Sequence, residues 1–250
     1  CDILKEEEST FVHGYMSNAG YEDVRDTIAR SLNRRFGTSF HQNNILMTVG
    51  AASGLNIILK TLLNPGDEVI VFAPYFVEYG SYVRNYDGNL VVISPNTEDF
   101  QPNLEKLGEK ITPRTKAVII NTPNNPTGVV YSAGTLARMA DILRERQTQL
   151  GTDIVLISDE PYRELAYDGV EVPYVTGFYE NTVICYSYSK SLSLPGERIG
   201  YLVIPDALKD SQEVFNAATI ANRVMGAVNA PSLMQRVIKR CVDENVNLEA

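Results

Sequence analysis

TVICYSYSKSLSLPGERIGYLVI, residues 182–204, holds two apolar runs on either side of a polar segment that contains Lys190. The runs TVICYS (182–187) and IGYLVI (199–204) are rich in β-branched and aromatic residues, and each has the length of a strand. Only 11 residues, 188–198, separate the two runs, which is too few for a crossover helix. We therefore expect two strands here, one of them antiparallel.

Five more β-rich runs precede these two, and most are continuously apolar, as expected of strands covered on both faces. Helical stretches lie between several runs. One ends at Gly37, a residue suited to a helix C-cap, and another begins at Ser132, a good N-cap. This alternation predicts an α/β fold with a mostly parallel seven-stranded sheet and helices on both faces. The five runs are ILMTV (45–49), EVIVFA (68–73), LVVIS (90–94), KAVIIN (116–121) and DIVLIS (153–158).

The composition argues against several classes of protein. The 250 residues are 44% hydrophobic and 21% charged, which is typical of a globular protein with a full core. A formal net charge of −9 argues against a nucleic-acid or anionic-membrane partner, and no apolar run has the length that spans a bilayer. The three cysteines and two histidines have no disulfide or metal-site spacing, so we expect no metal and a cytoplasmic setting. They are Cys1, Cys185, Cys241, His13 and His41.

The organisation of the chain predicts one domain, residues 1–250, because we find no repeat, low-complexity tract or linker. The sequence begins at Cys1 rather than at a methionine. It ends at Ala250 within a helical pattern that has no glycine or proline stop signal. We expect the domain to be a fragment of a longer protein.

Polar and aromatic residues directly follow five of the predicted strands. Ligands of such sheets bind beyond the carboxyl ends of the strands, so these residues are candidates for a functional site. Together they offer an anion cradle, aromatic rings, a side-chain amide, a carboxylate and a lysine. The segments are GAAS (50–53), PYF (74–76), TPNNPTG (122–128), DEPY (159–162) and SYSK (187–190).

The segment that begins at Gly50 is a candidate phosphate site. It lies between a strand and a helix, so the backbone amides of Ala51 and Ala52 can point from the helix N-terminus at a phosphate. Ser187 and Arg198 can add hydroxyl and guanidinium donors to the same phosphate. The ordinary alternatives are a turn without ligand and an exposed loop arginine.

Lys190 is the central candidate, because partial burial near cationic groups lowers the pKa of an amine and makes it a nucleophile and proton carrier. Asp159 is either a helix N-cap or the carboxylate that pairs with the pyridine nitrogen in lysine-linked pyridoxal phosphate sites. Tyr162 is either a packed aromatic or a partner of the phenolic oxygen of that cofactor. Asn125 suits a turn, and Phe76 suits the core. Their joint occurrence at strand ends favours the functional interpretation.

These segments resemble the class I/II aminotransferases, the aspartate aminotransferase family of fold-type-I pyridoxal phosphate enzymes. The resemblance covers essentially the whole chain. It is carried by SYSKSLSLPGERIGY (187–201), similar to the lysine motif of the family, NTPNNPTG (121–128), similar to its asparagine motif, SDEPY (158–162), similar to its Asp-x-x-Tyr element, VGAASGL (49–55), similar to its phosphate turn, and APYF (73–76).

The resemblance implies pyridoxal 5′-phosphate as the cofactor and the large, cofactor-binding domain of that family as the fold. It implies that Lys190 forms the internal aldimine and that Asp159 pairs with the pyridine nitrogen, with Tyr162 as the third catalytic residue. The other implied contacts are those of Gly50, Ala51, Ala52, Ser187 and Arg198 with the phosphate, of Asn125 and Tyr162 with the phenolic oxygen, and of Phe76 with the face of the ring.

YMSNAGYEDVRDTIA (15–29) resembles an early element of the family. Its tyrosine, here Tyr15, would reach the phosphate of the other subunit's cofactor, which implies a homodimer. The resemblance also implies cis peptide bonds before Pro74 and Pro126. The N-terminal arm of the family and its C-terminal small domain, which carries the arginine for the substrate α-carboxylate, have no counterpart in the sequence. Phe76 stands where aspartate-specific members have tryptophan.

We therefore expect an aminotransferase that moves an amino group between an L-amino acid and a 2-oxo acid. One alternative is a C–S β-lyase or a cyclopropane-forming synthase with the same cofactor, since these enzymes differ in the substrate pocket rather than at Lys190 or Asp159. Another is an aminotransferase-like sensor domain of a transcription regulator. A basic helix-turn-helix segment ahead of Cys1 would favour the sensor.

Overall fold

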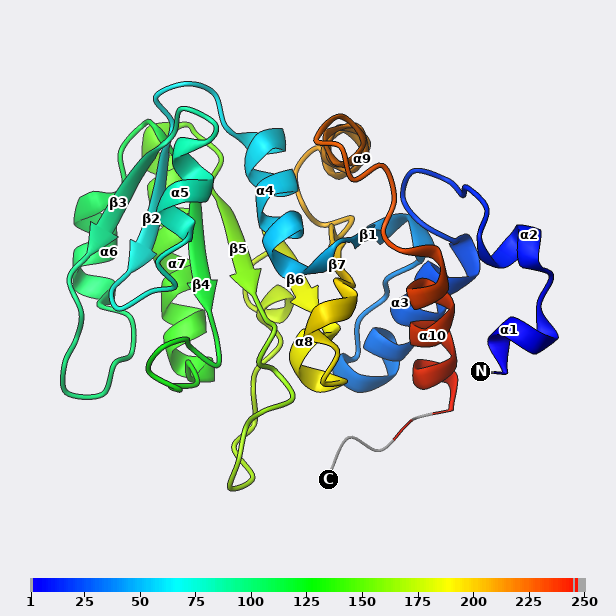
Figure 1. Ribbon diagram of the computed structural model, residues 1–250. Coiled ribbons are helices and arrows are strands. Elements are labelled where there is room, and N and C mark those ends of the chain that lie inside the picture. The colour runs from blue at the N-terminus through cyan, green and yellow to red at the C-terminus, as the bar shows by residue number, and fades with distance from the viewer. Residues whose placement is uncertain (1, 245, 247–250) are drawn as a thin grey trace.

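Seven strands form one sheet in the computed structural model, which describes residues 2–244 and 246 (Figure 1). Each strand coincides with one of the seven apolar runs. The largest boundary difference is at β5, which starts at Val155, two residues later than predicted. The N–H of Ile154 donates instead to the side-chain oxygen of Gln147 (2.6 Å). The strands are β1 (Ile45–Thr48), β2 (Glu68–Phe72), β3 (Asn89–Ile93), β4 (Thr115–Asn121), β5 (Val155–Asp159), β6 (Thr182–Ser187) and β7 (Gly200–Val203).

The strand order is β1-β7-β6-β5-β4-β2-β3, and the five strands from β6 to β3 are parallel. β7 is antiparallel to both of its neighbours, so the prediction of an antiparallel strand after Lys190 is confirmed. In the register of the central strands Asp159 pairs with Asn121 on one side and with Cys185 on the other. The carboxyl ends of β4, β5 and β6 therefore meet at one edge of the sheet.

Helices cover both faces of the sheet because alternate residues of each strand enter two separate hydrophobic clusters. In β4, Val118 and Ile120 face the cluster that includes α3, α6, α7 and α10, whereas Ala117 and Ile119 face the cluster of α4, α5 and α9. The longer helices are α3 (Glu22–Phe36), α4 (Gly50–Leu62), α5 (Tyr79–Arg84), α6 (Leu104–Lys110), α7 (Ala133–Leu150), α9 (Ser211–Val224) and α10 (Ser232–Asp243). The short elements are α1 (Ile3–Glu6), α2 (Ser9–Val12), η1 (Gln42–Asn44), η2 (Val175–Gly177), α8 (Tyr188–Ser191) and η3 (Pro195–Glu197).

Both predicted helix caps are confirmed. The Ser132 side chain accepts the N–H of Thr135 at the start of α7, and Gly37 ends α3 in the left-handed conformation with a φ of 66°. The peptide bonds before Pro74 and Pro126 are cis, as the resemblance implied, and so is the bond before Pro123. In the described part of the chain, no helix is both long and apolar enough to cross a membrane.

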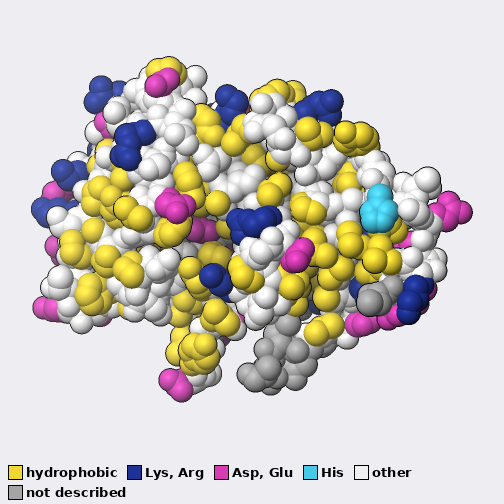
Figure 2. Space-filling view, in the orientation of Figure 1, with side chains coloured by type: hydrophobic (Ala, Val, Ile, Leu, Met, Phe, Trp, Pro, Cys, Tyr) yellow, Lys and Arg dark blue, Asp and Glu magenta, His cyan; other side chains and the backbone are white. Residues whose placement is uncertain are grey.

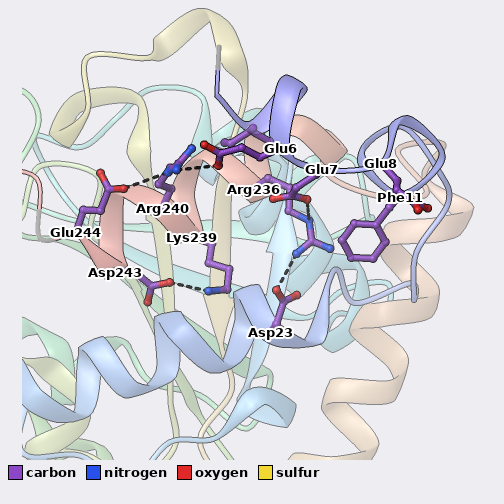
Figure 3. Close-up of a pocket in the computed structure, with 11 residues that line it drawn as sticks. Glu6, Glu7, Glu8, Phe11, Asp23, Arg236, Lys239, Arg240, Asp243 and Glu244 are labelled. Carbon is purple, nitrogen blue, oxygen red and sulfur yellow. Dashed lines mark hydrogen bonds and ion pairs between the residues drawn. The ribbon is translucent and has the colours of Figure 1, made fainter.

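The N-terminal helices α1 and α2 lie beside α10 around Arg236, which is only 4% exposed (Figure 3). Its guanidinium lies over the rings of Tyr21 (3.7 Å) and Phe11 (4.1 Å) and donates to Asp23 (2.7 Å). A cavity of about 610 Å³ opens beside it between α1, α2 and α10. Cys1 and the end of the predicted C-terminal helical pattern, at 245 and 247–250, lie outside the described residues.

Candidate active site

A cavity of about 310 Å³ opens at the carboxyl ends of β4, β5 and β6, beside the start of α4. On the face shown in Figure 2, basic and acidic side chains lie close together in this region, among hydrophobic ones. The cavity is lined by nine of the eleven residues that the sequence singled out, which are Ala51, Ala52, Phe76, Asn125, Asp159, Tyr162, Ser187, Lys190 and Arg198.

Asp159 ends β5 and is 5% exposed. Its Oδ2 accepts the hydroxyl of Tyr79 (2.6 Å), whereas its buried Oδ1 has no hydrogen-bond partner among residues 2–244 and 246. Burial raises the pKa of Asp159 to about 7, the Tyr79 hydrogen bond lowers it, and the charge of Glu160 raises it. A turn rather than a helix follows β5, so the N-cap interpretation is wrong. The free oxygen of a buried carboxylate requires a donor or a cation, and the described residues supply neither.

Asn125 and Tyr162 line the cavity next to each other, and the Asn125 amide donates to the Tyr162 hydroxyl (3.2 Å). Burial and the charge of Asp159 raise the pKa of that hydroxyl, and the amide lowers it. Asn121 connects this pair to Asp159. Its Oδ1 accepts the N–H of Asn125 (2.6 Å), and its Nδ2 donates to the Asp159 carbonyl (2.8 Å). The two loops that follow β4 and β5 are therefore held in a fixed relation.

Arg198 forms another wall together with the first turn of α4, which begins at Gly50; Gly50 itself does not line the cavity. Gly50 has a φ of +77°, and a Cβ at this position would lie 2.8 Å from Nη2 of Arg198. Glycine therefore allows the guanidinium to lie over the start of α4, where the first backbone N–H groups have no partner within the helix. Such a combination of a helix N-terminus and a guanidinium favours a phosphate-sized anion.

Ser187 lies between this wall and Lys190. Its hydroxyl accepts the N–H of Ser189 (3.1 Å) at the start of α8 and also contacts the Ser189 hydroxyl (2.8 Å). The residue is 3% exposed and lines the cavity. It therefore caps a turn of the chain and offers a hydroxyl to the cavity at the same time.

Lys190 is exposed, so the expectation of partial burial is wrong. It lies on α8, a single turn between β6 and η3, which carries its side chain to the open side of the cavity. Its Nζ lies 5.9 Å from the centre of the Tyr162 ring. The amine therefore faces the same space as Asp159 and Asn125.

Four residues of the site were missed by sequence reasoning. Asn121 is the last residue of its strand, so the rule that selected Asn125 could have found it. Tyr79 follows Phe76 by three positions, and no spacing rule indicates that it reaches Asp159. Glu78 and Tyr82 line the cavity near Phe76, and the Tyr82 hydroxyl donates to the Glu78 carboxylate.

Tyr15 does not line this cavity, and its side chain is 95% exposed. Its loop precedes α3. The predicted role of Tyr15 in the site of another subunit stays a prediction.

The sequence matches a family model described as aminotransferase class I and II over residues 3–247. A probable aspartate/prephenate aminotransferase of Thermus aquaticus is 37% identical over 208 residues, which are 82% of this chain and 52% of that protein. A probable aspartate/prephenate aminotransferase of Aquifex aeolicus is 35% identical over 227 residues, 86% of this chain and 56% of that protein. The chain thus spans about half the length of the curated relatives that it matches.

Solved structures show the same likeness. The crystal structure of an amino transferase from Eubacterium rectale superposes with a TM-score of 0.95 at 45% identity, covering 96% of this chain and 61% of that one. The aspartate aminotransferase of Thermus thermophilus with maleate gives a TM-score of 0.86 at 30% identity, covering 98% and 60%.

Proposed function

Since this chain belongs to the class I and II aminotransferase family, we propose that it binds pyridoxal 5′-phosphate and that the whole protein moves an amino group between an L-amino acid and a 2-oxo acid. The observation that carries the proposal is the Oδ1 of Asp159, which has no partner within residues 2–244 and 246. It lies in a cavity that is also lined by Lys190 and by the first turn of α4 with Arg198. The domain would be the cofactor-binding large domain of that protein.

The residues of the cavity fit this cofactor at both of its polar ends. The first turn of α4, Ser187 and Arg198 would hold its phosphate, and the carboxylate of Asp159 would pair with its ring nitrogen. Asn125 and Tyr162 would bind its phenolic oxygen, and Phe76 would contact its ring. When bound, the cofactor supplies an electron sink for the reaction at the substrate Cα.

The chain's own groups would then have separate tasks. Nζ of Lys190, on the open side of the cavity, would carry the proton between the substrate Cα and the C4′ carbon of the cofactor. Asp159 would keep a negative charge buried opposite the ring nitrogen. The hydrogen bonds of Asn121 to the two loops would keep Asn125 and Asp159 in place during each proton transfer.

An assay of the full gene product would test the proposal. We expect the purified protein, loaded with pyridoxal 5′-phosphate, to transfer the amino group of an L-amino acid to 2-oxoglutarate. Aspartate and prephenate are the first substrates to try, because two relatives are named for them. The same assay compares dicarboxylate with other amino acids, because the Glu78 carboxylate and the ring of Phe76 both line the cavity.

Release of pyruvate from cystathionine without amino transfer would contradict the proposal and favour the C–S β-lyase. Formation of a cyclopropane product would favour the synthase. Cofactor binding without turnover of either kind, in a protein with a basic helix-turn-helix segment, would favour the sensor. The cytoplasmic location expected from the cysteine spacing stays a prediction.

We further propose a homodimer in which Tyr15 completes the site of the other subunit. The exposed side chain of Tyr15 and the exposed apolar Val77, next to Phe76, support an interface near the cavity. A two-fold axis makes such a contact reciprocal. Mixing Tyr15→Phe subunits with Lys190→Ala subunits should therefore restore activity, because one site of each heterodimer then has both Tyr15 and Lys190.

Random exchange should make roughly a quarter of all sites intact in this mixture. Tyr167→Phe provides the matched control, since Tyr167 is another exposed loop tyrosine and its homodimer should keep full activity. Activity no higher than the share of the Tyr15→Phe homodimer would show that Tyr15 serves its own subunit or none.

A further inference from the structure

Tyr79 donates a hydrogen bond to the Asp159 carboxylate. It is 1% exposed, and its hydroxyl lies 2.6 Å from Oδ2 of Asp159. The two residues come from separate elements, because Tyr79 begins α5 after β2 while Asp159 ends β5. β4 lies between β2 and β5 in the sheet, so the tyrosine reaches past a whole strand to make this contact.

The ring of Tyr79 is fixed by its own surroundings. Its N–H donates to the carbonyl of Phe76 (3.1 Å), and the two rings meet edge to face at 5.6 Å. The Tyr75 ring lies nearly parallel to it at 6.5 Å. The fixed ring holds the hydroxyl oxygen within donating distance of Oδ2.

We infer that Tyr79 is a positioning residue for the proposed reaction, whose O–H holds the Asp159 carboxylate in one orientation and favours its ionised form. This inference rests on the proposed function. With Oδ2 occupied by the tyrosine, Oδ1 is the oxygen left for a ligand, and it is the one without a partner among the described residues. The chain thereby presents one defined oxygen to the ring nitrogen of the cofactor.

Charged and titratable groups face Asp159 from its own loop, from β6 and from α5. Glu160 follows it in the chain, Cys185 lies on β6, Tyr82 lies on α5, and Tyr162 lies on the same loop. Glu78, Lys190 and Arg198 also face the cavity. Among the described residues, Tyr79 alone makes a hydrogen bond to the carboxylate. This bond lowers the pKa of Asp159, whereas burial raises it.

Tyr79→Phe removes the hydroxyl and keeps the ring. Because the lost bond stabilised the charged form, the pKa of Asp159 should rise from about 7, by roughly one to two pH units for a hydrogen bond to a charged group. Tyr179→Phe is the matched control. Tyr179 is also 1% exposed, but its hydroxyl donates to the carbonyl of Ile154 (2.8 Å), away from the cavity.

The first measurement is the carboxyl titration of the ligand-free full chain, labelled with carbon-13 aspartate and followed by NMR. The Asp159 signal is assigned by its loss in Asp159→Asn. The midpoint should move upward in Tyr79→Phe and stay at the wild-type value in Tyr179→Phe. An unchanged midpoint in Tyr79→Phe overturns the inference, whatever the protein binds.

The second measurement is the dissociation constant of pyridoxal 5′-phosphate as a function of pH. At pH 7 Tyr79→Phe should bind roughly tenfold more weakly than the wild type and recover as the pH rises past the new midpoint. Weakening by the same factor at every pH would indicate damaged packing and overturn the inference. If the wild type binds no cofactor at any pH, the proposed function fails, while the carboxyl titration still decides the role of Tyr79.

Discussion

Lys190→Ala should abolish amino transfer and the covalent link to the cofactor while the sheet stays folded. Proton transfer by one positioned side chain contributes roughly 10²–10⁴-fold to a rate, and Lys190 would also be the nucleophile, so turnover should fall by at least about a thousandfold. The side chain is exposed and makes no hydrogen bond to any residue between 2 and 244 or to 246. The change in unfolding free energy should therefore stay within about 0.5 kcal/mol.

Borohydride reduction followed by mass measurement checks this result. The wild type should retain one reduced cofactor per chain, and Lys190→Ala should retain none. Lys60→Ala is the matched control, because Lys60 is another exposed lysine over a tyrosine ring, 5.6 Å from the centre of Tyr86. Cofactor fixed to Lys190→Ala at the wild-type stoichiometry would remove Lys190 from its proposed role.

Asp159→Asn should retain the cofactor and lose most turnover. Opposite charges roughly 4 Å apart at an effective dielectric constant near 20 attract by about 4 kcal/mol. This raises the pKa of the ring nitrogen by about 3 units, so the neutral amide should cost roughly a thousandfold in turnover. Asn can still accept the Tyr79 hydroxyl. Asp153→Asn, at an exposed aspartate before β5 that pairs with Lys209, should leave turnover unchanged.

The stability of the ligand-free protein offers a second measurement on Asp159→Asn. The folded pKa of about 7 is above the unfolded value, so the folded state binds the extra proton between about pH 4 and pH 7. The raised pKa of Asp159 therefore adds to the unfolding free energy at low pH, and this contribution is lost as the pH rises through 7. Asn should thus raise the unfolding free energy above pH 7 and give no difference below pH 4. Wild-type turnover in Asp159→Asn would exclude Asp159 from the pairing.

The sequence predicted the parts of the site that depend on one strand and the residues after it. Asn125, Asp159 and Ser187 each follow or end an apolar run, and parallel strands bring their carboxyl ends to one edge. The turn at Gly50 was found by the same rule. Local patterns were sufficient there because backbone direction alone decides where these residues lie.

Contacts between elements that are not neighbours could not be predicted in this way. The bond from Tyr79 to Asp159 depends on the strand order, which places β4 between their strands, and on the direction of one ring. The exposure of Lys190 depends on how far a single helical turn projects from the sheet edge. Residue spacing predicts neither the Tyr79–Asp159 contact nor the exposure of Lys190.

The pairing of β1 with β7 has a consequence for the synthesis of the chain. Asn44, just before β1, bonds to the carbonyl of Ile204, just after β7, and the two residues are 160 positions apart. At roughly 5–20 residues per second, a ribosome delivers β7 about 8–30 seconds after β1. During this time the backbone of β1 has no strand to pair with, although β2, β3 and β4 can already associate. A nascent chain that stops before Gly200 therefore leaves an apolar strand open to pairing with other chains.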